Sequence, residues 1–135
     1  LDLYVIAHIG IDLHMDHIGK KARVESAFLV QDKMKELGKG KELPAILTGD
    51  FNATPDAPEI RLITAALAGR GAVDCTAGLP GTFHDYGRLP PEKRERIDYI
   101  FTDGRCLDAY AVPDQPVNGQ YYSDHNAVAA LIELP

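Results

Sequence analysis

A short apolar run that ends in a polar turn constrains the fold of this chain more than any other feature. Residues 43–48 read Leu-Pro-Ala-Ile-Leu-Thr, and Gly49, Asp50, Phe51 and Asn52 follow directly. An apolar run of this length beside turn residues indicates a buried strand. Side chains at the carboxyl ends of such strands line the binding crevices of α/β proteins. We therefore expect Asp50 and Asn52 to line a cleft.

The stretch from residue 21 to residue 37 carries a helical pattern. Its apolar side chains recur at helical spacing and are expected to share one buried face. These side chains are Val24, Ala27, Phe28, Met34 and Leu37. Gly38 and Gly40 follow and are expected to end the helix.

A second helix is predicted at residues 56–68, with Asp56 as the N-cap and Glu59 three residues later, as in a capping box. The remaining apolar segments have strand patterns. These segments are residues 3–6 with Ile9, Ile11 and Leu13 continuing the alternation, 72–75, 97–102, 107–112 and 127–134. Residues 78–96 form a long loop, a feature that is often functional. The mixture predicts an α/β fold.

The composition excludes several classes of protein. With 135 residues, of which 45% are hydrophobic, the chain can bury a core as one domain. Its net charge of -6 argues against a broad basic surface that binds nucleic acid. No apolar run approaches the length of a membrane span. Cys75 and Cys106 match no metal-binding spacing; they can form one disulfide or two thiols, and the pair of thiols is favoured.

Asp50 and Asn52 have side chains suited to hydrolytic chemistry. A carboxylate at the end of a strand can orient or deprotonate an attacking water. A carboxamide can donate a hydrogen bond to a phosphoryl oxygen where charge develops. The alternative is a simple turn, because Gly, Asp and Asn are common turn residues.

Three other polar pieces are candidates. Asp124 and His125 precede the last strand and can act as a metal ligand and a proton carrier, or can be a solvated turn. Asp98 interrupts an apolar run, and a half-buried carboxylate there needs a partner such as the His125 ring. His14 and His17 lie in a loop that is either a metal site or a plain polar connection.

The order of these pieces resembles the endonuclease/exonuclease/phosphatase superfamily, and the likeness is closest to small bacterial members of unassigned specificity. The group includes type I deoxyribonucleases, apurinic endonucleases, sphingomyelinases and inositol-polyphosphate phosphatases. The matching segments are residues 13–17, 22–23, 47–55, 81–84, 96–101 and 123–125. The resemblance therefore runs along nearly the whole chain.

The resemblance implies a role for each matching residue. Asp50 is the base or water-orienting carboxylate, Asn52 contacts the scissile phosphate, and Asp98 orients His125, which stabilises or protonates the phosphoryl group. Asp124, together with Asp50, is a metal ligand. Three supporting contacts to phosphate or substrate are also implied, and these come from His14, Arg23 and His84. The implied cofactor is Mg²⁺ or Mn²⁺, since these cations prefer oxygen ligands.

The same resemblance implies that residues 1–135 are the carboxyl-terminal part of a longer domain. The family fold is a four-layer α/β/β/α sandwich, and this chain corresponds to about half of it, with a mixed, mainly antiparallel sheet and covering helices. The amino-terminal part, which supplies an Asn and a Glu to the metal, is absent. An apolar sheet face left exposed needs cover. We expect that the missing half or a second copy provides it, and an inactive remnant is the third option.

The expected function is metal-dependent hydrolysis of phosphate esters or phosphodiesters by the intact protein, with little activity in the isolated chain. One alternative is a binding module that keeps the fold without chemistry. Another is a zinc protein that uses His14, His17, His84 and His125, although only the first two are closely spaced.

The acidic charge balance favours a small or lipid-linked phosphorylated substrate and does not exclude nucleic acid. Four basic residues in the long loop, Arg88, Lys93, Arg94 and Arg96, either recognise phosphate or form a solvated surface. The second of these interpretations is favoured. The sequence supports no prediction of the compartment.

Overall fold

The computed structural model of the chain describes residues 9–37 and 43–134. The helices within these residues are α1 (Lys20–Leu37) and α2 (Pro58–Ala68), with one 3-10 turn at Pro91–Lys93. The strands are β1 (Ile9–His14), β2 (Ala45–Asp50), β3 (Val73–Asp74), β4 (Asp98–Thr102), β5 (Arg105–Val112) and β6 (Ala127–Glu133). None of the described helices is long and apolar enough to cross a membrane. The predicted α/β fold class is confirmed.

The larger sheet has four strands in the order β1-β2-β4-β3. The α1 helix connects β1 to β2, which run parallel, whereas β4 is antiparallel to both of its neighbours. The expected mixed, mainly antiparallel sheet is therefore present. The strand expected at residues 3–6 lies outside the described residues, as do Gly38 and Gly40.

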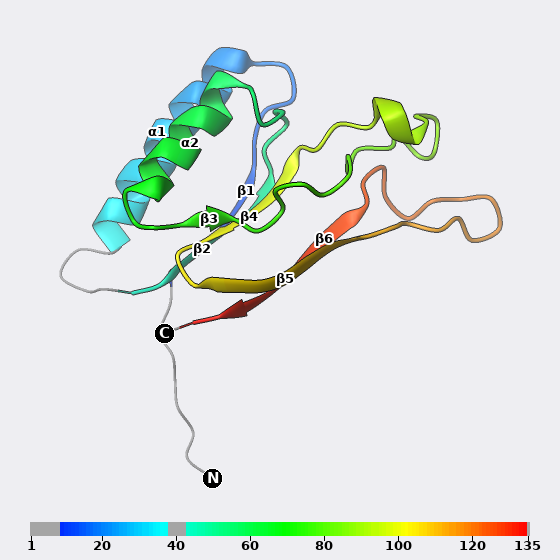
Figure 1. Cartoon of the computed structure of the whole chain (residues 1–135). Helices are drawn as coiled ribbons and strands as arrows, with labels where there is room; N and C mark the ends of the chain where they lie inside the picture. Colours follow the sequence, from blue (N-terminus) through cyan, green and yellow to red (C-terminus); the bar gives the residue numbers. More distant parts are fainter. Residues whose placement is uncertain (1–8, 38–42, 135) are drawn as a thin grey trace, which may run out of the picture.

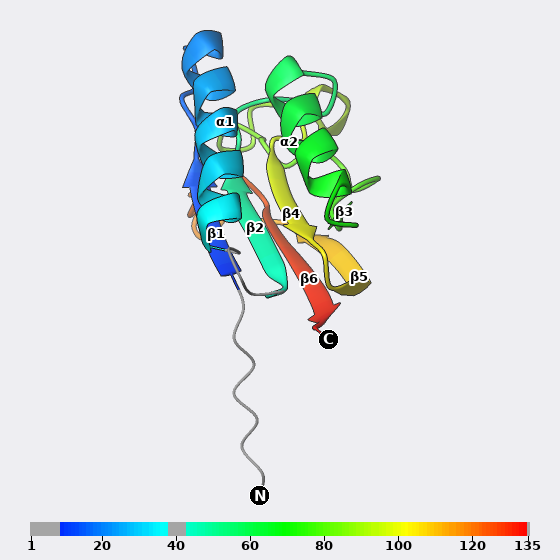
Figure 2. The same cartoon turned by 90° about the vertical axis from the view of Figure 1, so that its left-hand side faces the viewer.

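The β5 and β6 strands form a separate antiparallel hairpin. Figures 1 and 2 show α1 and α2 side by side on one face of the four-stranded sheet and the hairpin on the opposite side. The hairpin approaches the larger sheet through contacts between β6 and β4. The described residues thus form three layers, which are helices, sheet and hairpin.

The hydrophobic core lies between the two helices and the sheet. Side chains of α1 and α2 such as Ala27 and Ile63 pack onto Leu47, Tyr99 and Phe101 of the sheet, and all five are at most 2% exposed. Because side chains alternate along a strand, Asp50 and Asp98 point away from this core, towards the hairpin. The fold therefore places polar strand ends between the two sheets.

Two details of the predicted helices are wrong. Asp56 does not cap α2: the N-cap is Ala57 without a side-chain hydrogen bond, and the Asp56 carboxylate accepts a hydrogen bond from the Thr54 hydroxyl instead. On α1, Phe28 and Leu37 are 45% and 43% exposed, although Ala27 and Met34 are buried as expected. The buried residues of α1 are Arg23, Ala27, Val30 and Met34, which form one stripe along the helix, and Phe28 and Leu37 lie outside this stripe.

Candidate active site

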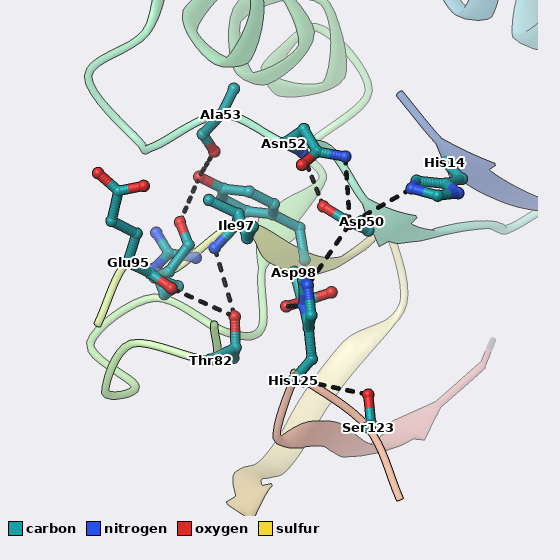
Figure 3. Close-up of polar contacts among 12 residues, drawn as sticks. His14, Asp50, Asn52, Ala53, Thr82, Glu95, Ile97, Asp98, Ser123 and His125 are labelled. Carbon is teal, nitrogen blue, oxygen red and sulfur yellow. Dashed lines mark hydrogen bonds and ion pairs between the residues drawn. The ribbon is translucent and has the colours of Figure 1, made fainter. Parts of the chain in front are cut away.

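Three polar residues form a row across neighbouring strands of the large sheet. His14 at the end of β1 pairs with Asp50 at the end of β2, and Asp50 pairs with Asp98 at the start of β4. The His14 Nε2 atom lies 3.6 Å from Asp50 Oδ2. The row follows from the strand register, because the three residues lie side by side at the ends of three adjacent strands (Figure 3).

Gly49 allows the strands to approach one another at this row. Its φ of 139° is unfavourable for other residues, and a Cβ atom there would lie 1.9 Å from the Leu13 carbonyl oxygen. The next residue but one, Phe51, is fully buried and packs edge-on against Tyr99 and Phe101. The glycine and the buried ring together hold Asp50 at the rim of the sheet.

Asn52 connects Asp50 to the loop that follows β1. Its backbone has a positive φ of 47°, and its N–H donates to Asp50 Oδ1 at 2.8 Å. Its side-chain Nδ2 donates to the Met15 carbonyl at 2.8 Å and to Asp50 Oδ2 at 3.2 Å. Both amide hydrogens are thus already used, and contact with a phosphate requires release of the longer bond.

His125 reaches this row from the hairpin layer. Its Nδ1 lies 2.8 Å from Asp98 Oδ2, and its Nε2 lies 3.8 Å from Asp50 Oδ2. The Phe83 ring contacts the imidazole edge-on at 5.2 Å between centroids. The main-chain N–H of His125 donates to the Ser123 hydroxyl at 3.1 Å and holds the backbone that carries the ring. The imidazole is therefore fixed by contacts on several sides (Figure 3).

The environment shifts the pKa of two of these groups. Burial raises the pKa of Asp50 above its usual value, and the nearby Asp98 carboxylate adds to the effect. The hydrogen bond to Asp98 raises the pKa of His125. Both shifts favour the protonated form of the group, and a carboxyl beside an imidazole provides two groups that can exchange protons with a substrate.

A cleft of about 440 Å³ collects these side chains. It is lined by His14, His17, Asp50, Asn52, Phe83, Asp124 and His125. The structure thus brings most of the residues expected in the site into one concavity. Phe83 is an addition that the sequence interpretation missed, because a phenyl ring carries no ionisable group and only its place between Thr82 and His84 draws attention to it.

The segment 82–85 holds the Asp124 loop in place through its main chain. The N–H groups of His84 and Asp85 donate to the Asp124 carbonyl at 2.8 and 3.1 Å, and the Asn126 N–H donates to the Thr82 carbonyl at 2.8 Å. The His84 side chain is 1% exposed. Its Nδ1 accepts a hydrogen bond from the Gly87 N–H, and its Nε2 has no partner among the described residues. His84, expected to contact substrate, is therefore buried and is not among the described residues that line the cleft.

Arg23, expected to support a substrate contact, takes part in a buried ion pair near the start of α1. Its side chain is buried, and its Nε donates to the buried Glu59 carboxylate of α2. Its Nη1 donates to the Asp16 carbonyl at 2.9 Å. The pair ties the loop after β1, which Asn52 also contacts, to both helices. Glu59 was not anticipated as a partner, since 36 residues separate it from Arg23.

The basic residues of the long loop do not form a common patch. Arg88 pairs with Asp85, Arg96 pairs with Asp74 and lies over the Tyr99 ring, and Arg94 donates to the Leu89 carbonyl. Three of the four basic side chains thus have partners within the protein; Arg88 is exposed, as in the expected solvated surface, whereas Arg96 is largely buried.

The oxygen ligands in the cleft fit a hard divalent cation. Donor atoms of Asp50, Asp98 and His125 lie within 4.8 Å of one another, and Asp124 lines the same cleft. One or two carboxylates with water and substrate oxygens are the usual environment of Mg²⁺. A zinc site built from His14, His17, His84 and His125 lacks support in the described residues, because no such group of histidines converges.

The comparison with family models gives one match. Residues 7–125 match the Endonuclease/Exonuclease/phosphatase family. The search of curated proteins finds no match.

Solved structures give further matches. The chain is 37% identical to the mannosyl-6-phosphatase of Bacteroides thetaiotaomicron, with a TM-score of 0.76. The match covers 92% of this chain and 50% of the phosphatase. It is 35% identical to an endonuclease/exonuclease/phosphatase from Bacteroides vulgatus, with a TM-score of 0.77 and coverage of 90% and 48%. The catalytic domain of human nocturnin, at 19% identity, a TM-score of 0.61 and coverage of 92% and 45%, shares the fold.

The chain thus spans about half the length of the solved relatives that it matches. The family model covers most of the chain and includes the strand ends and the cleft. On this evidence, the chain belongs to the endonuclease/exonuclease/phosphatase family.

Proposed function

We propose that the intact protein, meaning this chain with any sequence that accompanies it, is a divalent-metal-dependent phosphoesterase that acts on small phosphate esters. The convergence of Asp50, Asn52 and the Asp98–His125 pair on one cleft carries this proposal. The family provides the reaction class, and the similar mannosyl-6-phosphatase supports a small phosphorylated substrate.

Each group has a chemical task in the proposed reaction. Asp50, whose pKa is raised by burial, orients the attacking water and accepts its proton. Protonated His125 donates a hydrogen bond to the phosphoryl oxygen, and Asp98 holds the imidazole in the required orientation. Asn52 holds Asp50 and can turn its longer hydrogen bond towards the phosphate. His14 lies on the other side of Asp50 and supports the same phosphate.

Asp124 and Asp50 are the proposed ligands within this chain for Mg²⁺ or Mn²⁺, which would neutralise charge on the phosphate when bound. Arg23 and His84 are proposed to support the loops around the cleft, because both side chains are buried.

The hairpin provides the argument for a covering partner. Tyr110, Val112 and Leu131 point away from the large sheet and are 53%, 44% and 60% exposed. Exposed apolar side chains on an unpaired hairpin require cover. We propose that the complementary half of the fold supplies it, since the chain accounts for about half of the matching structures.

Phosphate release by the intact protein tests the function directly. Assays of phosphomonoesters and phosphodiesters with Mg²⁺, with Mn²⁺ and with a chelator should show activity that depends on the metal. The isolated chain should release little phosphate under the same conditions. An intact protein that binds the esters without hydrolysing any of them would instead support a non-catalytic binding module.

A further inference from the structure

A second hollow adjoins the catalytic cleft. It has a volume of about 690 Å³ and is lined by residues at the start of α1 and in the loop from β2 to α2, together with Glu95. Asn52 lines both hollows. The chain after β1 borders both as well: His17 of the loop lines the cleft, and Lys20, the first residue of α1, lines the second hollow. We call this second hollow the side groove. A phosphate ester held beside Asn52 therefore has a concave surface next to it.

Polar side chains of both charges line the side groove. They include Lys20, Lys21, Asn52, Thr54, Asp56 and Glu95. The two lysines are exposed, and neither has an ion-pair partner among the described residues. The Arg23–Glu59 pair also lines the groove, but each of these charges already faces the other. The two ammonium groups and the Glu95 carboxylate are thus available to a ligand, and Asp56 offers the oxygen that does not accept from the Thr54 hydroxyl.

This lining has a clear chemical preference. Ammonium groups donate hydrogen bonds and carboxylates accept them, so a ligand with many hydroxyl groups can use both. No aromatic side chain is among the described residues that line the groove, and it therefore offers no platform for stacking a nucleobase. The three basic and three acidic side chains of the lining balance, so the groove has no net charge that would select a polyanion. A neutral polyol is the ligand class that satisfies all three conditions.

We propose that the side groove binds the hydroxyl-rich leaving group of a sugar phosphate whose phosphate occupies the catalytic cleft. Lys20, Lys21 and Glu95 are its specificity-determining residues, with Asp56 at the same wall. The inference rests on the proposed phosphoesterase function and adds the class of alcohol that is released. Its basis is the groove itself, with Asn52 shared between the two hollows.

The test compares two substrates in the intact protein. Mannose 6-phosphate would place its sugar hydroxyl groups in the groove. Phenyl phosphate is also a phosphate monoester, but its leaving group carries no further hydroxyl groups. The Lys20→Gln, Lys21→Gln and Glu95→Gln variants keep the side-chain size approximately and remove the charge. The measured quantity is kcat/KM for mannose 6-phosphate divided by kcat/KM for phenyl phosphate. Each variant is expected to lower this ratio by about tenfold, because it loses one charge-assisted hydrogen bond to the sugar. The change should appear chiefly in the KM for mannose 6-phosphate. Lys35→Gln, further along α1 and outside the groove, is the matched control and should leave the ratio unchanged.

The outcomes separate this inference from the function beneath it. A ratio that stays constant in all three variants contradicts the side groove as a sugar subsite. So does a loss of kcat/KM that affects a nucleoside 5′-phosphate but not mannose 6-phosphate. An equal loss on both esters indicates a structural role and also contradicts it. Wild-type protein that hydrolyses phenyl phosphate but not mannose 6-phosphate overturns the inference while the phosphoesterase function stands. Wild-type protein inactive on every ester overturns both.

Discussion

His125 lies in the loop before the hairpin strand β6 and Asp98 lies in the larger sheet, yet His125 Nδ1 and Asp98 Oδ2 are 2.8 Å apart. Asp98 begins β4 in the larger sheet, and His125 precedes β6 of the hairpin. The contact therefore connects two layers of the fold at the cleft. Loss of this contact would therefore change both the position of the imidazole and the packing of the hairpin against the larger sheet.

This pair predicts a pH dependence of stability. The hydrogen bond to Asp98 raises the pKa of His125, so the folded protein holds the imidazole proton more tightly than the unfolded chain does. The resulting stabilisation is complete below the unfolded pKa of about 6.5 and is lost as pH rises through the raised folded pKa. Urea unfolding of the intact protein at a series of pH values, compared with Asp98→Asn, should show the difference in unfolding free energy shrinking over this window. A difference that grows with pH would contradict the pairing.

Gly49 predicts a pair of contrasting substitutions. Gly49→Ala places a Cβ against the Leu13 carbonyl and forces an unfavourable φ, so we expect a loss of several kcal/mol or failure to fold. Gly71→Ala is the matched control: its φ of 76° is also positive, but nothing lies within 4 Å of the added Cβ. It should cost about 1 kcal/mol. Equal losses in the two variants, measured by urea unfolding, would contradict the close approach of β1 and β2.

The buried Arg23–Glu59 pair predicts a non-additive result. Removal of one partner leaves a buried charge, so Arg23→Met and Glu59→Leu should each destabilise the intact protein by roughly 3–5 kcal/mol. The double variant should be much closer to wild type in stability, because neither charge is then left alone. Its kcat should still be reduced, because the Asp16 carbonyl loses its donor and the loop held by Asn52 loosens. Additive losses in the double variant would argue against a direct pair.

Much of the fold could be predicted because apolar periodicity is local. The strand at residues 43–48 and the one at 97–102 are present as β2 and β4, shifted by one or two residues, and α1 begins one residue early. The Asp56 cap failed because the Thr54 hydroxyl competes for its carboxylate. The expected burial of Phe28 is wrong because a helical pattern alone does not show which of the apolar side chains the sheet contacts.

The site shows the same division between local and distant information. The strand-end positions of Asp50 and Asn52 follow from the sequence near them. The proximity of Asp98 and His125 was expected because a half-buried carboxylate requires a hydrogen-bond partner. The burial of Arg23 by Glu59 depends on how α1 meets α2, and that packing leaves no trace in the residues around either one. The side groove likewise arises from three separate segments and has no sequence signature.

Phosphate release by the intact protein with and without the Asp50 carboxylate tests the central claim most directly. Asp50→Asn keeps the shape of the side chain, and it should lower kcat by roughly 10²- to 10⁴-fold while the circular dichroism spectrum stays the same. Activity in the Asp50→Asn protein equal to that of wild type would contradict the assignment of this cleft as the catalytic centre.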